Sequence, residues 1–346
     1  MKIVADERVA GLDEAFGRHG TVLKLPGRDI RRSHLQDADA LLVRTVTQVD
    51  ASLLEGTAVR FVGTATIGFD HIDTRFLDAA GIAWTNAPGC NADATAQYTV
   101  SMYLLACRRL GRNALQGKYG VVGRGNVGGR LMRLVEALGL DTIACDPPLG
   151  SQGVPDLVSM DAILECDAIS LHVPLTHSGH WPTIHMMNQE IFSALSTDAL
   201  LINSSRGDVV NGEALGEWMA QGGTAALDVW PGEPDIDTNL LARSIVATPH
   251  VAGYSLDGKN RASAMVYRAF CAQFGYQGLE SPPTVDSIKA QPQLRGAALA
   301  DAILSATPVE KDDASMRGLL DVPYGDRGKF FESLRSGYML RRDLQL

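Results

Sequence analysis

The sequence contains no apolar run of the roughly 20 residues that a membrane-spanning helix requires. Its best candidate, residues 98–107, includes Ser101 and runs directly into Arg108 and Arg109. Asp6 and Glu7 interrupt the amino-terminal segment, which therefore does not resemble a secretory signal peptide. We expect a cytoplasmic protein that has no membrane partner.

Positive charge is also scarce. The chain has 31 Lys and Arg residues against 40 Asp and Glu residues, so its formal net charge is −9. A nucleic-acid binder needs a surplus of cations to displace counterions from phosphates, and this balance therefore argues against nucleic acid as a partner. A small anionic substrate stays compatible with it, because one site needs only a few local cations.

Cysteines are few and scattered. The five cysteines form no C-x-x-C pair, and they are Cys90, Cys107, Cys145, Cys166 and Cys271. An odd number without paired spacing predicts neither a disulfide framework nor a zinc site, so we expect reduced, buried thiols and no metal. The sequence also lacks internal repeats and low-complexity tracts.

The dominant pattern is an alternation of short apolar runs with longer helical stretches, which is typical of parallel sheets covered by helices. Hydrophobic residues make up 45% of the 346 residues, and this length suits two or three globular domains. The pattern occurs twice, which predicts an α/β protein with two Rossmann-like or flavodoxin-like parallel-sheet domains. A shorter, more polar tail with helical pieces follows a linker at residues 278–283.

The first block contains five predicted strands, at residues 2–5, 21–25, 40–43, 60–63 and 82–85, and helices at 9–19, 51–55 and 74–80. The second block opens with a helix at 92–110 and continues with strands at 119–122, 142–146, 168–172, 199–203, 225–229 and 244–248. A helix at 259–273 returns toward the first block. We predict one discontinuous domain of residues 1–95 and 250–280, a second domain of residues 96–249, and a third of residues 281–346.

A glycine motif follows the first strand of the second block. Gly123, Gly125 and Gly128 satisfy G-x-G-x-x-G between that strand and a helical pattern at 127–138. Glycines at these positions allow a tight turn, close approach of a pyrophosphate, and close helix–strand packing. Asp146 lies 18 residues beyond Gly128 at the end of the next strand, where a carboxylate binds ribose hydroxyls and favours NAD over NADP. Alone, Asp146 is equally well explained as a cap before Pro147.

Three further residues follow predicted strands and suit dehydrogenase chemistry. Arg206 can pair with a substrate carboxylate through its planar guanidinium, His250 can act as a general base, and Glu233 can orient and stabilise its imidazolium. Taken singly, each has a simpler explanation: Arg206 as a surface loop arginine, His250 as a loop or core histidine, and Glu233 as a solvated loop acid.

Taken together, these segments resemble the D-isomer-specific 2-hydroxyacid dehydrogenases. The similarity rests on the glycine motif with Asp146 and on residues 203–210, 227–234 and 248–253. It implies that Arg206, Glu233 and His250 form the catalytic set and that residues 1–95 and 250–280 bind substrate. The implied NAD-binding residues are Gly123, Gly125, Asn126, Val127, Gly128, Asp146, Val173, Ser204, Ser205, Arg206, Asp228 and Gly253.

Residues 43–47, 63–73, 87–92 and 331–342 resemble a branch of this family that acts on a phosphorylated sugar acid. This closer resemblance implies substrate contacts from Thr45, Thr66 and Tyr254, and Arg44 as a nearby counter-charge. It also implies a homodimer, with residues 281–346 as a small α+β dimerisation domain. Three positions depart from the family pattern. Val173 replaces a common threonine, Gln97 a usual glutamate, and Thr45 a typical serine.

Two other functions remain open from the sequence. D-3-phosphoglycerate dehydrogenase, or another D-2-hydroxyacid dehydrogenase, would use the same catalytic set on a different acid. A non-catalytic NAD-sensing binding protein could share the fold, but retention of all three catalytic residues and of the tail argues against it.

Overall fold

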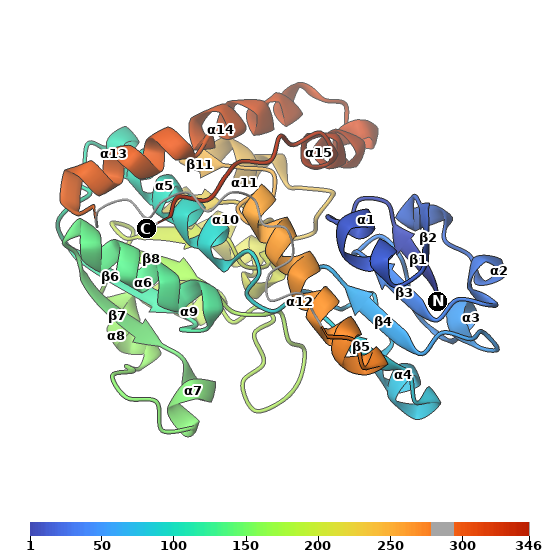
Figure 1. The fold of residues 1–346 in the computed structure, drawn as a ribbon. Coiled ribbons are helices and arrows are strands. Elements are labelled where there is room, and N and C mark those ends of the chain that lie inside the picture. Colours follow the sequence, from blue (N-terminus) through green and yellow to red (C-terminus); the bar gives the residue numbers. More distant parts are fainter. Residues whose placement is uncertain (278–293, 346) are drawn as a thin grey trace. The chain divides into compact units, whose positions relative to one another are not determined.

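A computed structural model describes residues 1–277 and 294–345 of the chain. It divides into two compact units (Figure 1). Unit 1 consists of Met1–Asn91 and Ser255–Lys289, and unit 2 of Ala92–Tyr254 and Ala290–Leu346. The described part of the tail thus groups with unit 2, and the division into three domains stays a prediction. The linker predicted at 278–283 lies outside the described residues.

Unit 1 contains one sheet of five parallel strands in the order β2-β1-β3-β4-β5. The strands are β1 (Lys2–Asp6), β2 (Thr21–Leu25), β3 (Ala40–Val43), β4 (Phe61–Thr64) and β5 (Ala83–Thr85). This order is that of flavodoxin-like folds. Every residue of β3 and β4 is buried, as expected for central parallel strands that are covered on both faces.

Helices cover both faces of the unit 1 sheet. They are α1 (Leu12–Ala15), α2 (Arg32–Leu35), α3 (Ala51–Leu54), α4 (Thr74–Ala80) and α12 (Leu256–Phe274). One core joins Phe16 and the α12 residues Val266 and Phe270 to one face, while α2, α3 and α4 pack on the other. The helix predicted at 9–19 is wrong in extent, because Gly11 adopts a left-handed conformation with φ 67° and α1 begins only after it.

Unit 2 contains a sheet of six parallel strands in the order β11-β10-β9-β8-β6-β7. The strands are β6 (Lys118–Val122), β7 (Asp141–Cys145), β8 (Ala168–Leu171), β9 (Leu200–Asn203), β10 (Thr224–Leu227) and β11 (Val246–Ala247). Together the two sheets confirm the predicted pair of parallel-sheet α/β domains. The strand predicted at 244–248 is shortened to β11. At its two ends the Ser244 hydroxyl donates to the carbonyl of Leu240 and the Thr248 hydroxyl donates to Asp228.

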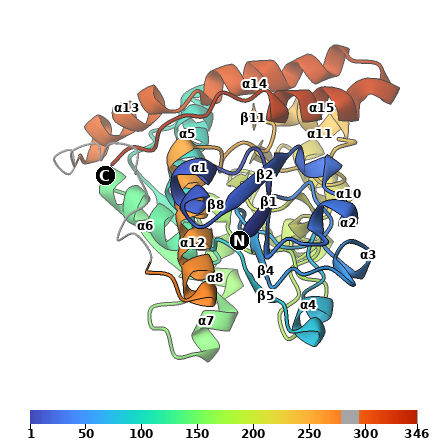
Figure 2. The same cartoon turned by 45° about the vertical axis from the view of Figure 1, so that its right-hand side comes forward.

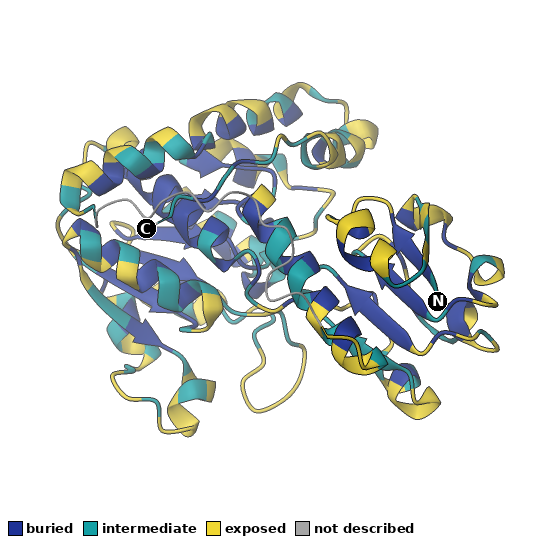
Figure 3. Ribbon diagram, viewed as in Figure 1, coloured by how far each residue is buried: buried dark blue, intermediate teal, exposed yellow. Residues whose placement is uncertain are grey.

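Two hydrophobic cores enclose the unit 2 sheet, whose strands β8, β9 and β11 are buried along their length (Figure 3). The long helix α5 (Ala92–Leu110), α6 (Asn126–Leu138) and α13 (Gly296–Ala306) line one face (Figure 2). The opposite face is covered chiefly by α8 (Met160–Leu164), α9 (Gln189–Ala194), α10 (Gly212–Ala220) and α11 (Thr238–Arg243). A further short helix, α7 (Pro147–Ser151), follows β7.

The tail adds α14 (Val309–Arg317), which packs beside the edge strand β11, and α15 (Arg327–Ser336), which contacts α14. The carboxylate of Asp313 accepts a hydrogen bond from the backbone nitrogen of Ala247 at 2.7 Å. Arg109 donates to the carbonyl of Ile245 at 2.5 Å, and Arg317 to that of Ser244 at 2.7 Å. Side chains therefore satisfy the outer backbone groups around β11.

The cysteine prediction is confirmed, because all five thiols are free and buried. Burial raises the pKa of Cys90 and of Cys166 to about 11. Within residues 1–277 and 294–345, no helix combines the length and apolar character needed to cross a bilayer.

Candidate active site

The predicted site residues of unit 2 gather at one edge of its sheet, because the carboxyl ends of parallel strands all meet there. Gly123 follows β6, Asp146 follows β7 and Arg206 follows β9. Glu233 lies in the loop after β10, and His250 lies in the loop after β11.

The glycine turn between β6 and α6 is closed by backbone atoms at Gly123 and Gly128 and is open at Gly125. A side chain on Gly123, which has φ 90°, would lie 2.6 Å from the carbonyl oxygen of His172. One on Gly128 would lie 1.9 Å from the carbonyl oxygen of Gly123. Gly125, in contrast, has no heavy atom within 4 Å of its β-carbon position. This is the arrangement that pyrophosphate binding requires: Gly123 and Gly128 allow a tight turn and close helix packing, and the open space at Gly125 admits the pyrophosphate.

Asp146 connects this turn to the next loop. Its Oδ2 accepts a hydrogen bond from the backbone nitrogen of Arg124 at 2.8 Å, and its Oδ1 accepts one from Leu149 at 3.0 Å. The capping role is therefore present at the start of α7. Each carboxylate oxygen keeps lone-pair capacity for a ribose hydroxyl, so the two roles are compatible.

The remaining predicted cofactor contacts lie around the same edge. Asn126 and Val127 begin α6, and a Val173 methyl group lies 2.9 Å from the β-carbon position of Gly123. Val173 thus fills space beside the turn, where a threonine would also offer a hydroxyl. The Ser204 hydroxyl is 2.7 Å from that of Thr99 on α5, within hydrogen-bond distance.

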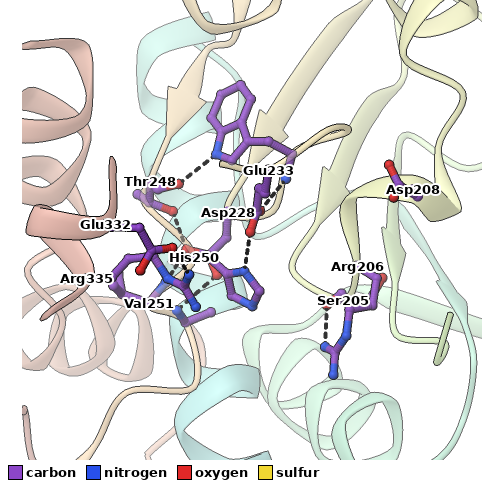
Figure 4. Close-up of polar contacts among 12 residues, drawn as sticks. Ser205, Arg206, Asp208, Asp228, Glu233, Thr248, His250, Val251, Glu332 and Arg335 are labelled. Atoms are coloured by element: carbon purple, nitrogen blue, oxygen red, sulfur yellow. Dashed lines mark hydrogen bonds and ion pairs between the residues drawn. The ribbon is translucent and has the colours of Figure 1, made fainter. Parts of the chain in front are cut away.

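The loop after β9 folds on itself around Asn203. The backbone nitrogen and the hydroxyl of Ser205 both donate to Asn203 Oδ1, at 3.0 and 2.8 Å, and Asn203 Nδ2 donates to the carbonyl of Arg206 at 2.9 Å. The Arg206 guanidinium donates to the carbonyl of Ser205 at 2.8 Å. It lies apart from His250 (Figure 4). A side chain on Gly207 would lie 1.8 Å from the carbonyl of Trp230, so only glycine fits after this arginine.

Glu233 and His250 form a direct pair (Figure 4). His250 Nδ1 donates to Glu233 Oε2 at 2.8 Å, and the side chains are 29% and 20% exposed. Glu233 Oε1 accepts a second hydrogen bond from the backbone nitrogen of Trp230 at 2.7 Å. Because Nδ1 carries the proton toward the carboxylate, Nε2 is the basic nitrogen available to a substrate.

Asp228 anchors the loop that carries His250. It is 1% exposed, and its Oδ1 accepts hydrogen bonds from the Thr248 hydroxyl at 2.7 Å and the Val251 nitrogen at 2.9 Å. Its Oδ2 accepts one from the Ala252 nitrogen at 3.0 Å. His250 adopts φ 56° in this loop, a left-handed conformation that is costly for a residue with a side chain.

No role was predicted for Arg335, which α15 brings near the pair (Figure 4). Arg335 Nη1 donates to Glu332 Oε1 at 2.8 Å. Burial by itself would lower the pKa of Arg335, but the charges of Tyr254, Glu332 and Glu233 outweigh it and raise that pKa. In the sequence, the resemblance of residues 331–335 to the family's tail was the feature that pointed to this segment.

The predicted substrate residues lie in both units. In unit 1, Thr45 is exposed, whereas Thr66 shares a hydrogen bond of 2.6 Å with Thr64 and donates to the carbonyl of Gly68 at 2.8 Å. In unit 2, the ring of Tyr254 packs edge-on against that of Tyr338 with centroids 5.8 Å apart. The role of these residues toward substrate stays a prediction.

Comparison with known proteins adds to this geometry. Residues 96–252 match the model of the D-isomer specific 2-hydroxyacid dehydrogenase NAD-binding domain. The chain is 44% identical to erythronate-4-phosphate dehydrogenase of Azotobacter vinelandii and 42% identical to that of Stutzerimonas stutzeri, each match covering 99% of this chain and 93% of the relative. The fold resembles NAD⁺-bound 3-phosphoglycerate dehydrogenase of Entamoeba histolytica, with TM-score 0.69 and 21% identity over 82% of this chain and 99% of that one.

Proposed function

The chain belongs to the erythronate-4-phosphate dehydrogenases of the D-isomer specific 2-hydroxyacid dehydrogenase family, and we propose that it oxidises 4-phospho-D-erythronate at C2. The protein is an NAD-dependent dehydrogenase. The proposed product is 2-oxo-3-hydroxy-4-phosphobutanoate, made in the cytoplasm as part of pyridoxal phosphate biosynthesis. The hydrogen-bonded pair of Glu233 and His250 is the observation that carries the chemistry.

In this reaction His250 Nε2 takes the proton of the C2 hydroxyl. The turn at Gly125 and the carboxylate of Asp146 would hold NAD, which would supply the acceptor for the hydride of C2. The imidazole becomes positively charged, and Glu233 stabilises that charge because it already binds the opposite nitrogen at 2.8 Å. The backbone bond from Trp230 keeps the carboxylate in place during the transfer.

Arg206 holds the C1 carboxylate in the proposed reaction. A planar guanidinium can bind a carboxylate through two parallel hydrogen bonds and can polarise the adjacent C2 oxygen. Within the described part of the chain its guanidinium donates to the carbonyl of Ser205, a neutral acceptor that a carboxylate can displace.

Unit 1 offers cations for the phosphate of the substrate. The buried carboxylate of Asp6 accepts hydrogen bonds from Arg44 Nε at 3.1 Å and from the backbone nitrogen of Arg8 at 2.9 Å. Burial lowers the pKa of Lys259, and the charges of Arg44 and Arg8 lower it further against the opposing effect of Asp6. Arg44 thus binds the buried acid directly, and Lys259 lies within electrostatic range of Asp6, Arg44 and Arg8. A dianionic phosphate would balance the surplus of positive charge. We assign Thr45, Thr66 and Tyr254 to the substrate as well.

The deciding experiment supplies the purified protein with NAD and 4-phospho-D-erythronate, with and without a 2-oxo acid acceptor, and follows NADH absorbance. D-3-phosphoglycerate and unphosphorylated D-erythronate serve as competing substrates. We expect the highest kcat/KM for 4-phospho-D-erythronate, and a loss of about 100-fold or more in His250→Gln with NAD binding retained. Higher kcat/KM for D-3-phosphoglycerate would refute the substrate assignment. NAD binding without turnover of any 2-hydroxy acid would favour an NAD-sensing protein instead.

Variants of unit 1 test the phosphate assignment separately. Arg44→Gln and Lys259→Gln should lower kcat/KM for the phosphorylated acid by about tenfold or more and leave that for D-erythronate nearly unchanged. Lys24→Gln, which removes an exposed ion pair with Asp13, is the matched control. Equal losses on both acids would contradict a phosphate role.

We also propose a homodimer, on the resemblance of the tail to the family's dimerisation domain. Light scattering of the purified full chain tests it, and a monomer at all concentrations would refute it.

A further inference from the structure

The C-terminal tail places one buried arginine against the back of the catalytic loop. Arg341 is 9% exposed, and its Nη1 donates to the carbonyl oxygens of Val251 at 3.1 Å and Tyr254 at 2.8 Å. Its Nη2 donates to the carbonyl of Ala252, and also to that of Ala94 on α5 at 3.1 Å. A single guanidinium thus binds three carbonyls of the loop that begins at His250.

The same loop is held from its other side by Asp228. That carboxylate accepts hydrogen bonds from the backbone nitrogens of Val251 and Ala252, while the nitrogen of His250 donates to the Asp228 carbonyl at 2.7 Å. Loop nitrogens therefore face an anion and loop carbonyls face a cation. The left-handed backbone of His250 lies next to this doubly bound segment, and such a conformation persists only where the surroundings fix it.

Two tyrosines, one on α5 and one in the tail, orient Arg341. Its guanidinium lies 4.6 Å from the ring centre of Tyr98 and contacts the Tyr338 hydroxyl at 3.4 Å. Asp312 accepts hydrogen bonds from both of these tyrosines, at 2.8 and 3.0 Å. The Tyr338 hydroxyl therefore links the buried guanidinium to the Asp312 carboxyl group, which reduces the cost of burying the cation.

We propose that Arg341 is a positioning residue for His250, and that its contacts with the loop carbonyls hold the imidazole against Glu233. The proposal rests on the proposed dehydrogenase function. The position requires an arginine, because its planar guanidinium carries enough donors to reach the four carbonyls described above. A lysine would present its three donors from a single nitrogen and could not reach all four. The tail thereby acts on catalysis from behind the site, without touching the substrate.

Kinetics of Arg341→Lys and Arg341→Ala provide the first test. A displacement of His250 by about 1 Å should lower kcat by about 10- to 100-fold, with the KM for NAD changed less than about twofold. Millimolar guanidinium should restore part of the activity of Arg341→Ala, since the vacated position is buried. Arg32→Ala is the matched control, because Arg32 in unit 1 also binds backbone carbonyls, those of Ala51 and Ser52.

The ring N–H resonance of His250 in the NMR spectrum provides the second test, and it needs no substrate. The resonance is assigned by its loss in His250→Gln, and we expect it to broaden or exchange faster in Arg341→Lys but not in Arg32→Ala. If Arg341→Ala does not fold, Arg341→Lys decides the matter. An unchanged His250 resonance, or kcat of Arg341→Lys within about twofold of the parent, would overturn the proposal. If the parent protein itself turns over no 2-hydroxy acid, the proposed function fails, while the resonance still tests the positioning role.

Discussion

Replacing Asp228 by asparagine, which exchanges one carboxylate oxygen for an amide nitrogen, should lower the free energy of unfolding of unit 2. The carboxylate accepts three hydrogen bonds, from Thr248, Val251 and Ala252, and it is 1% exposed. An asparagine has one acceptor oxygen, and its amide group must face a backbone nitrogen in either orientation. If the amide replaces Oδ2 it faces the Ala252 nitrogen, and if it replaces Oδ1 it faces the Val251 nitrogen. Only the Thr248 hydroxyl can reverse and accept.

The expected cost follows from this count. One orphaned backbone nitrogen costs about 1–3 kcal/mol, and the surviving bonds lose the extra strength of an ionised acceptor. The free energy of unfolding should therefore fall by about 2–4 kcal/mol, which lowers the Tm of a unit of this size by about 5–15 °C. Because the same bonds hold the His250 loop, kcat should fall as well.

Differential scanning calorimetry of Asp228→Asn measures the shift. Asp167→Asn is the control, since Asp167 is exposed and accepts one hydrogen bond from the backbone nitrogen of Lys118 at 2.7 Å, which an asparagine oxygen can keep. A Tm of Asp228→Asn within about 2 °C of the parent would refute the reasoning, because the buried bonds would then carry no stability.

Three further substitutions test the site and its surroundings. Glu233→Gln should lower kcat by about 100-fold in steady-state assays while NAD binding is retained, because a neutral amide does not stabilise the imidazolium of His250. Gly128→Ala should abolish NAD binding in a fluorescence titration, since the added carbon would lie 1.9 Å from the carbonyl of Gly123. Burial lowers the pKa of His172 from 6.5 to about 3. Between these two pH values the side chain binds a proton in the unfolded protein but not in the folded protein. Stability should therefore fall by about 1.4 kcal/mol per pH unit as the pH drops from about 6.5 toward 3, and His172→Gln should remove this part of the slope in urea unfolding.

Each of these has a matched control. Glu190→Gln removes an exposed acid from the first turn of α9 and should leave kcat unchanged. Gly129→Ala places its carbon at an ordinary contact distance of 3.7 Å from the Arg124 carbonyl and should retain NAD binding. His180→Gln, at an exposed position, should keep the acid slope of the parent. Equal behaviour of a variant and its control would contradict the corresponding prediction.

Sequence patterns predicted the sheets well, because buried parallel strands are continuous apolar runs with sharp polar boundaries. The strands at 21–25 and 40–43 and the helices at 74–80 and 92–110 have the bounds that were predicted. Short helices such as α7 and α8 were missed, since four or five residues carry no periodicity. These helices are set by local caps, such as Asp146 and Ser159, that look like loop residues.

The site was predictable where a residue follows a strand. Glu233 and His250 come from loops after the adjacent strands β10 and β11, so sheet topology alone brings them together. Arg335 and Arg341 could not be found this way, because they reach the region through packing of the tail. Contacts of that kind depend on tertiary structure and leave no spacing pattern in the sequence.

The arrangement around β11 also bears on how copies of this protein can associate. An edge strand with free backbone groups invites another chain to add to the sheet, which leads to aggregation. Here Asp313, Arg109 and Arg317 occupy those groups, and two of the three side chains belong to α14. The tail thus protects this margin of the unit 2 sheet from intermolecular strand pairing, and its loss would expose unpaired backbone groups three residues before His250.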